Sequence, residues 1–129
     1  MNKAKCDCHC QDQKDLRLIF SCSGASDVGH ITDLAARKLT QIQVGNMYCL
    51  AGIGGGVSGI LKTTEAANSI VTIDGCSLNC AKKTLERAGF KDFKHIELSQ
   101  MGMLKGSTEP TEDNIQKVVQ KVQDILCQN

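Results

Sequence analysis

Short apolar runs alternate with longer amphipathic stretches from residue 16 to the end of the chain. Residues 16–21, 47–51 and 70–73 are mostly apolar runs of strand length, a pattern typical of strands buried on both faces of a parallel sheet. Residues 94–98 alternate more between apolar and polar positions and predict an edge strand. The sequence therefore predicts four strands.

The stretches that follow these runs carry apolar residues at helical spacing, so each predicts a helix with one apolar face. The first three stripes consist of Val28, Ile31, Leu34, Ala35 and Leu39, then Val57, Ile60, Leu61 and Thr64, then Leu78, Ala81, Leu85 and Ala88. Gly89 predicts the end of the third helix. The last helix has Thr111 as its predicted cap and the stripe Ile115, Val118, Val119, Val122, Ile125 and Leu126.

Four strand–helix units in succession imply right-handed crossovers and a parallel sheet covered by helices on both faces. We therefore predict an α/β three-layer sandwich around a four-stranded, mostly parallel sheet, as in Rossmann-like and flavodoxin-like folds. In such folds, ligands bind beyond the carboxyl ends of the strands, where the strand order reverses. Residues 1–15 are polar, contain cysteines and show no periodicity, so we predict a tail outside the core.

Composition narrows the class of protein. The chain has 129 residues, of which 41% are hydrophobic and 22% charged, values that suit one globular domain. A net charge of +1 and 3% aromatic residues argue against nucleic acid as a partner. The longest uncharged stretch, residues 46–61, is shorter than the ~20 apolar residues of a membrane span. The amino terminus has no apolar signal segment, so we expect a cytoplasmic protein.

Eight cysteines are more than a small core needs, and in a reducing compartment clustered cysteines bind metals or do redox chemistry. Cys22, Cys49 and Cys76 follow the first three predicted strands with separations of 49 − 22 = 27 and 76 − 49 = 27 residues. Because this spacing equals one strand–helix unit, we expect the three thiols at the same edge of the sheet. Cys80 lies one helical turn beyond Cys76.

The strand order 2-1-3-4 would place the three cysteine-bearing strand ends side by side. Adjacent strands lie ~4.8 Å apart and Zn–S bonds are ~2.3 Å long, so three neighbouring loops can converge on one ion. The order 3-2-1-4 would separate the ends of the first and third strands by ~10 Å and strain the site. If Ser77 caps the third helix, both Cys76 and Cys80 lie at its positive end, which favours thiolate. Thiolate serves metal binding and nucleophilic attack alike, so this placement does not decide between them.

Several of these segments together resemble the DGC-domain family, which is named for an Asp-Gly-Cys tripeptide. The tripeptide here is Asp74-Gly75-Cys76, and the resemblance also covers residues 21–26, 49–54 and 80–83. It implies that Cys22, Cys49, Cys76 and Cys80 act together as a zinc site, and it assigns no reaction. Residues 16–129 would then form a single α/β metal-binding domain.

Gly54-Gly55-Gly56-Val57-Ser58-Gly59 fits the GxGxxG pattern of dinucleotide-binding turns, with Asp74 twenty residues beyond Gly54. The chain offers few strands for a second nucleotide half, so a tight glycine turn beside the thiols is the preferred interpretation. Asp74 would then either support the turn that carries Cys76 or cap a turn without further role.

The amino-terminal cluster of Cys6, Cys8, His9 and Cys10 could bind a soft metal and deliver it to the core, or do nothing specific. His30 could support Cys22, serve as a substitute ligand, or be a solvated surface residue, which is the preferred interpretation. Lys82, Lys83 and Arg87 could offset the charge of a four-thiolate site or form an ordinary solvated face. Cys127 falls off the apolar stripe of the last helix and is given no role.

The sequence thus predicts a protein that holds one zinc ion through Cys22, Cys49, Cys76 and Cys80 in a structural or metal-handling role. The alternative is a thiol redox or sulfur-transfer enzyme, with Cys76 as nucleophile and Cys80 or Cys22 as resolving thiol. An iron–sulfur cluster held by the same thiolates is a third possibility.

Overall fold

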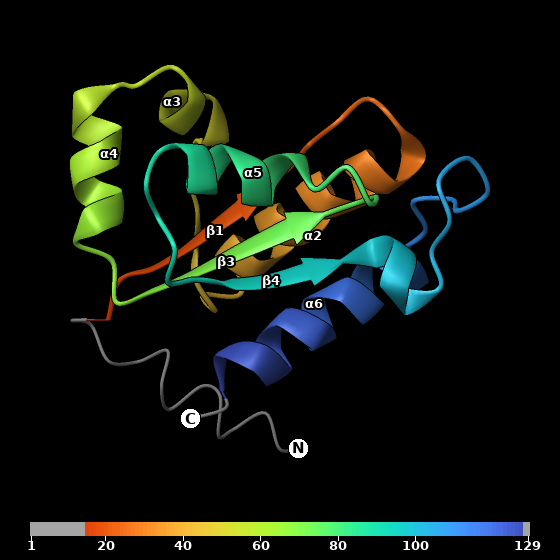
Figure 1. Cartoon of the computed structure of the whole chain (residues 1–129). Helices are drawn as coiled ribbons and strands as arrows, with labels where there is room; N and C mark the ends of the chain where they lie inside the picture. The colour runs from red at the N-terminus through yellow and green to blue at the C-terminus, as the bar shows by residue number, and fades with distance from the viewer. Residues whose placement is uncertain (1–14, 128–129) are drawn as a thin grey trace.

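The computed structural model describes residues 15–127. Strands and helices alternate along this part of the chain, as Figure 1 shows. In chain order the elements are β1 (Arg17–Ser21), α2 (Asp27–Gln41), β2 (Asn46–Met47), α3 (Leu50–Gly54), α4 (Ser58–Glu65), β3 (Ser69–Asp74), α5 (Cys80–Arg87), β4 (Lys94–Glu97), the 3-10 helix η1 (Leu98–Met101) and α6 (Glu112–Leu126).

The four strands form one parallel sheet in the order β2-β1-β3-β4, which confirms the predicted topology. β1 pairs with β3 along its whole length, from Arg17 opposite Ser69 to Ser21 opposite Ile73. β2 is much shorter and pairs only through Asn46 and Met47. The strand order therefore reverses beside β1, and the carboxyl ends of β2, β1 and β3 are neighbours.

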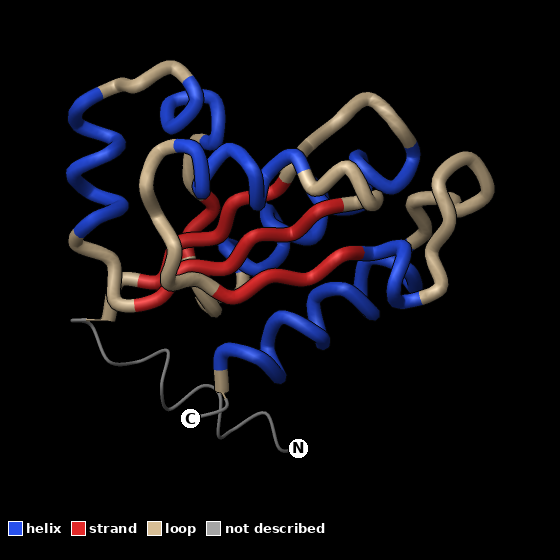
Figure 2. The backbone as a smooth tube through the Cα atoms, in the orientation of Figure 1, coloured by secondary structure: helices blue, strands red, loops and turns tan. Residues whose placement is uncertain are grey.

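Helices cover both faces of the sheet, with α3, α4 and α5 on one side and α2 and α6 on the other (Figures 1 and 2). Alternate residues of β1 point to opposite faces. Leu18 and Phe20 pack in a cluster with Ile53 and Leu85. Ile19 packs in a larger cluster on the opposite face, with α2 and α6. The three-layer α/β sandwich that the sequence predicts is confirmed.

The prediction that residues 47–51 form a strand is wrong beyond Met47. Tyr48 donates its amide hydrogen to the carbonyl of Ile19 at 2.9 Å, after which the chain leaves the sheet. Residues Leu50–Gly54 instead form the short helix α3. The apolar residues of this run cover the sheet: Ile53 is buried in the cluster over β1. A short apolar run does not distinguish a buried strand from a buried helical turn.

The predicted cap of α6 and the predicted end of α5 agree with the structure. Thr111 caps α6 by accepting a hydrogen bond from the amide of Asn114 at 3.1 Å. Ser26 caps α2 in the same way, through the amide of Gly29. Gly89 follows the last residues of α5 with φ +98°, a conformation that glycine adopts without strain.

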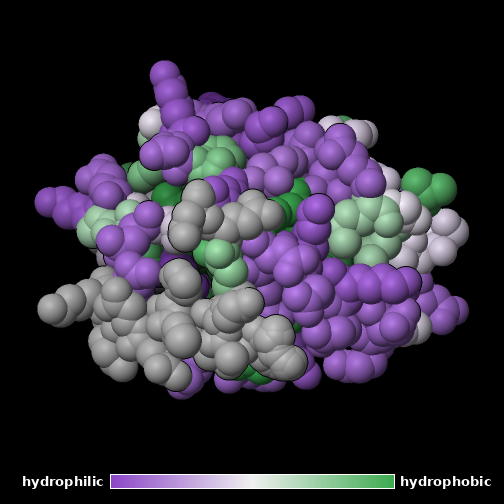
Figure 3. Space-filling view, turned by 90° about the horizontal axis from the view of Figure 1, so that it is seen from below, coloured by the Kyte–Doolittle hydropathy of each residue, from purple (hydrophilic) through white to green (hydrophobic). Residues whose placement is uncertain are grey.

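The face that carries α6 is mostly hydrophilic where described residues are drawn (Figure 3). This agrees with the exposed polar residues of α6, whose apolar stripe is buried against the sheet. Within residues 15–127, the helices are too short or too polar to cross a membrane.

Candidate metal centre

Three of the four predicted cysteine ligands follow the carboxyl ends of three adjacent strands. Cys22 comes directly after β1, and its amide still donates to the carbonyl of Ile73 on β3 at 3.0 Å. Cys49 precedes α3 as its N-cap residue, two positions after β2. Cys76 lies two residues beyond β3. Because all strands are parallel, these residues share one edge of the sheet.

The four candidate thiols differ in exposure but all reach the surface. Cys49 and Cys80 are exposed, whereas Cys22 and Cys76 are partly buried. All four are free cysteines rather than members of disulfides. They therefore remain available as ligands or nucleophiles.

Cys22 is the thiol most closely engaged with the rest of the fold. Its Sγ lies 3.5 Å from Oγ1 of Thr32, a fully buried residue of α2. The Thr32 hydroxyl donates to the carbonyl of Gly29 at 2.7 Å and accepts from the amide of Ser23 at 3.1 Å. Thr32 thus fixes the loop that carries Cys22 as well as the position of its sulfur.

The helix that carries the fourth cysteine starts later than predicted. Ser77 is not its cap: α5 begins at Cys80, and its N-cap residue is Asn79 in a left-handed conformation with φ 53°. The Asn79 side chain makes no cap hydrogen bond, and its buried Oδ1 has no hydrogen-bond partner. Cys80 is therefore the first residue of the helix instead of the third.

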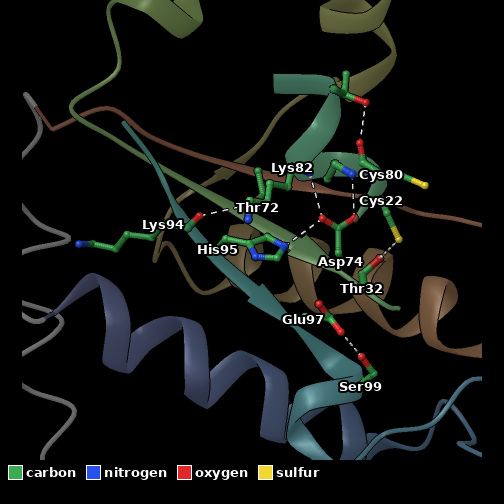
Figure 4. A network of polar contacts seen from close by, with 12 residues as sticks. Cys22, Thr32, Thr72, Asp74, Cys80, Lys82, Lys94, His95, Glu97 and Ser99 are labelled. Atoms are coloured by element: carbon green, nitrogen blue, oxygen red, sulfur yellow. Dashed lines mark hydrogen bonds and ion pairs between the residues drawn. The ribbon is translucent and has the colours of Figure 1, made fainter. Parts of the chain in front are cut away.

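Asp74 supplies the cap that Ser77 was predicted to provide. Its two carboxylate oxygens accept from the amides of Ala81 at 2.7 Å and Lys82 at 3.0 Å, in the first turn of α5. The carboxylate is 1% exposed, and Nε2 of His95 lies 3.1 Å from Oδ2 (Figure 4). Asp74 thus fixes the first turn of α5, next to Cys80, from the end of β3 and does not merely cap a turn within its own loop.

Gly75 brings the same turn against α2. A Cβ atom at this position would lie 2.8 Å from Cγ2 of Val28 and 2.9 Å from its backbone carbonyl carbon. Only glycine allows such a close approach of two backbones. The Asp-Gly-Cys tripeptide therefore combines a helix cap, a close backbone contact and a thiol in consecutive residues.

A groove beside the carboxyl ends of β1 and β2 is lined by two of the thiols and by an ion pair. Cys22 and Cys49 both line it, as do Asp33, Arg37 and Tyr48. Burial opposes ionisation of Asp33, but hydrogen bonds from Arg37 and Ser23 outweigh that effect and lower its pKa. Nε of Arg37 donates to Oδ2 of Asp33 at 2.6 Å, and this pairing raises the pKa of the guanidinium.

The donor set suits zinc in kind and in number, since zinc is commonly bound by four thiolates. However, the described side chains do not stand as a closed site: within residues 15–127 no three His, Cys, Asp or Glu residues are arranged to hold a metal ion. Figure 4 shows the Cys22 and Cys80 side chains on the same side of the Asp74 carboxylate, projecting away from it. Closure around one ion requires these side chains to turn toward one another from their present positions.

The other residues singled out in the sequence lie apart from this site or on its margin. His30 is exposed on α2, and Lys83 and Arg87 are exposed on α5. Cys127 is the C-cap residue of α6. Cys6, Cys8, His9 and Cys10, with the rest of the predicted tail before Asp15, fall outside the described residues.

The glycine-rich segment that fits GxGxxG spans the end of α3 and the start of α4 instead of opening a single helix. In a dinucleotide site, the acidic residue after the second strand binds a ribose hydroxyl. Here both carboxylate oxygens of Asp74 already accept hydrogen bonds from α5. The geometry therefore supports the alternative of a tight turn beside the thiols.

Sequence reasoning missed His95, Thr32 and Arg37. The period of two along β3 puts Asp74 on the same face as Thr72, which is readable from the sequence, but the register that pairs Thr72 with His95 on β4 comes from the structure. The roles of Thr32 and Arg37 depend on how α2 is rotated against the sheet. The i, i+4 spacing of Asp33 and Arg37 predicts their ion pair. Helix positions alone do not show that Thr32 meets Cys22 or that Arg37 lines the groove beside Cys49.

These features define a class: an α/β protein with a four-stranded parallel sheet and cysteines at the carboxyl ends of three neighbouring strands. The DGC domain family matches residues 18–122, so the chain belongs to the DGC domain family. It is also similar to the Anaerobic and virulence modulator AnvM of Pseudomonas aeruginosa, with 33% identity over 97 residues, which cover 75% of this chain and 74% of the relative. No solved structure matches the chain at a significant level.

Proposed function

We propose that this protein binds one zinc ion through the thiolates of Cys22, Cys49, Cys76 and Cys80, in a structural or metal-handling role. The observation that carries the proposal is the adjacency of β2, β1 and β3 in a parallel sheet, with a free cysteine just beyond each carboxyl end. Cys80, at the start of the next helix, supplies the fourth sulfur.

The dimensions of the sheet favour such a site. Neighbouring strands lie ~4.8 Å apart, and four sulfurs around a tetrahedral zinc at ~2.3 Å lie about 3.8 Å from each other. The outer two of the three strands, β2 and β3, lie two such spacings apart, so side-chain rotation and loop movement must bring Cys49 and Cys76 toward one another. The chain itself contributes by holding Cys76 through the close packing of Gly75 on Val28, and Cys80 through the Asp74 cap of α5.

Four thiolates would leave zinc without an open coordination position for water or substrate. Zinc in such a setting supplies structural cross-linking between loops, and it can be passed on by exchange of thiolate ligands. This supports a binding role over hydrolysis.

Elemental analysis of the full-length chain, purified without added metal, tests the proposal. We expect close to one zinc per chain, and we expect the Cys76→Ser variant to lose it. The matched control replaces Cys6, Cys8 and Cys10 together by serine, which removes the amino-terminal thiols and leaves the proposed ligands intact. Zinc that persists in Cys76→Ser but disappears in the triple variant would refute the assignment.

A second candidate is a thiol redox or sulfur-transfer centre that uses Cys76 as nucleophile and Cys80 or Cys22 as resolving thiol. Its support is that the thiols of Cys22, Cys76 and Cys80 are free and exposed or partly buried, so they are available for attack and exchange. Rapid alkylation of Cys76 at neutral pH, with or without chelator, would support it. Slow labelling that chelator accelerates would support zinc binding instead.

A further inference from the structure

The groove beside Cys49 combines a reactive group with an anion-binding group. Cys49 is free and exposed, and it lines the groove together with Cys22, Ser21 and Ser23. Asp33 and Arg37 are the charged residues among those that line it in the described chain. The groove thus has the parts needed to hold a small anion next to a thiol.

In the groove, the carboxylate of Asp33 is fully hydrogen-bonded, whereas the guanidinium of Arg37 can still bind an anion. Both oxygens of Asp33 are occupied, Oδ1 by the hydroxyl of Ser23 at 2.7 Å and Oδ2 by Nε of Arg37 at 2.6 Å. Ser23 in turn lies 2.7 Å from the buried Ser21 hydroxyl, so Asp33 is held in a fixed network. Arg37 uses only Nε in this pair, and its side chain is 62% exposed. Its two Nη groups are therefore free to bind a planar anion in bidentate fashion.

We infer that this groove binds a small disulfide that carries a carboxylate, and that Cys49 is a site of S-thiolation by it. The Arg37 guanidinium would hold the carboxylate while the disulfide lies against Cys49. Small thiols derived from cysteine carry a carboxylate a few bonds from sulfur, which matches the groove's pairing of a guanidinium with a thiol. This inference goes beyond zinc binding and concerns the metal-free thiol.

The reaction is thiol–disulfide exchange, and the bound disulfide is the oxidant. Cys49 loses its proton to solvent, and its thiolate attacks one sulfur of the small disulfide. A new bond forms between Cys49 and that sulfur as the original disulfide bond breaks. The other half leaves as a thiolate and takes up a proton. One disulfide is consumed and one mixed disulfide is formed, so electrons balance.

Three small disulfides of different charge test the inference on the reduced, chelator-treated full-length chain. These are dithiodipropionate (anionic), hydroxyethyl disulfide (neutral) and cystamine (cationic), and the rate of adduct formation at Cys49 is followed by mass spectrometry of peptides. Each rate is divided by the rate for the urea-unfolded chain, which removes differences in intrinsic disulfide reactivity. We expect dithiodipropionate to be favoured over the neutral reagent by about fivefold at low salt, the scale of one exposed ion pair.

Arg37→Gln should abolish this preference, whereas Arg87→Gln, which removes an exposed arginine outside the groove, should keep it. Equal rates for the anionic and neutral reagents, an unchanged preference in Arg37→Gln, or adducts only at other cysteines would overturn the inference. The zinc content of Arg37→Gln should match that of the unmodified chain, since Arg37 is not a proposed ligand. The outcome therefore does not depend on whether zinc binding is correct.

Discussion

Replacing Asp74 by alanine should destabilise the protein through one identifiable set of hydrogen bonds. The carboxylate is buried at 1% exposure and accepts from the amides of Ala81 and Lys82 at 2.7 and 3.0 Å. In the alanine variant, both amides at the start of α5 lose their acceptor. A buried donor left without a partner costs ~1–3 kcal/mol, so for the two amides we expect a loss of roughly 2–6 kcal/mol in the free energy of unfolding.

The isosteric variant Asp74→Asn provides a graded comparison. Its Oδ1 can still accept from Ala81, and its amide nitrogen can donate to His95 once that ring adopts the other tautomer. Only the amide of Lys82 is then left opposite a donor. We therefore expect a loss of about 1–2 kcal/mol, clearly smaller than that of the alanine variant.

Urea unfolding followed by circular dichroism measures both losses, with Asp113→Asn as the control because that carboxylate is 81% exposed and pairs with Lys117 on the surface. The control should change stability by less than about 0.5 kcal/mol. A loss below about 0.5 kcal/mol for Asp74→Ala would refute the capping role, as would equal losses for Ala and Asn at this position.

Three other perturbations follow from the packing and the charges. Gly75→Ala should cost about 1–3 kcal/mol by overpacking, because its Cβ would lie 2.8 Å from Val28 Cγ2, and thermal unfolding should show a lower Tm. Leu39→Ala should cost ~2–5 kcal/mol in urea unfolding, since Leu39 is fully buried in the cluster with α6; a loss below 1 kcal/mol would contradict the described core. Hydrogen bonds from the amides of Gly106 and Thr108 lower the pKa of Asp27 below 3.8. Asp27 therefore stabilises the fold above that pH and loses its effect as pH falls through the lowered pKa, so Asp27→Asn should remove part of the acid dependence of unfolding and leave its remainder unchanged.

The parallel sheet was predictable because repeated strand–helix units are a property of the chain itself, and the order 2-1-3-4 followed from the expectation that the cysteine-bearing strand ends meet at one edge. The end of β2 was not predictable, because a short apolar run can equally continue a buried strand or form a helix that covers the sheet, as α3 does here. The start of α5 was also missed. Its cap comes from Asp74, at the end of the preceding strand, whereas local capping patterns consider only residues next to the helix.

The same distinction holds for the candidate site, whose position at the sheet edge was predictable and whose side-chain contacts were not. The sequence predicted which elements bring Cys22, Cys49 and Cys76 to one edge, because topology determines where strands end. It could not predict the contact of Cys22 with Thr32, because that contact depends on the rotation of α2 against the sheet. The Asp33–Arg37 ion pair lies at i, i+4 on one helix and was readable from the sequence, but its place in the groove beside Cys49 was not. Side-chain partners between elements follow from packing, which the pattern of apolar residues describes only coarsely.

X-ray absorption at the zinc edge of the purified chain tests the central proposal most directly, because it counts the atoms bound to the metal. Coordination by the four cysteines predicts about four sulfur neighbours at ~2.3 Å and no nitrogen or oxygen, with one sulfur fewer in Cys80→Ser. A first shell dominated by nitrogen or oxygen, or one that is identical in Cys80→Ser, would contradict it.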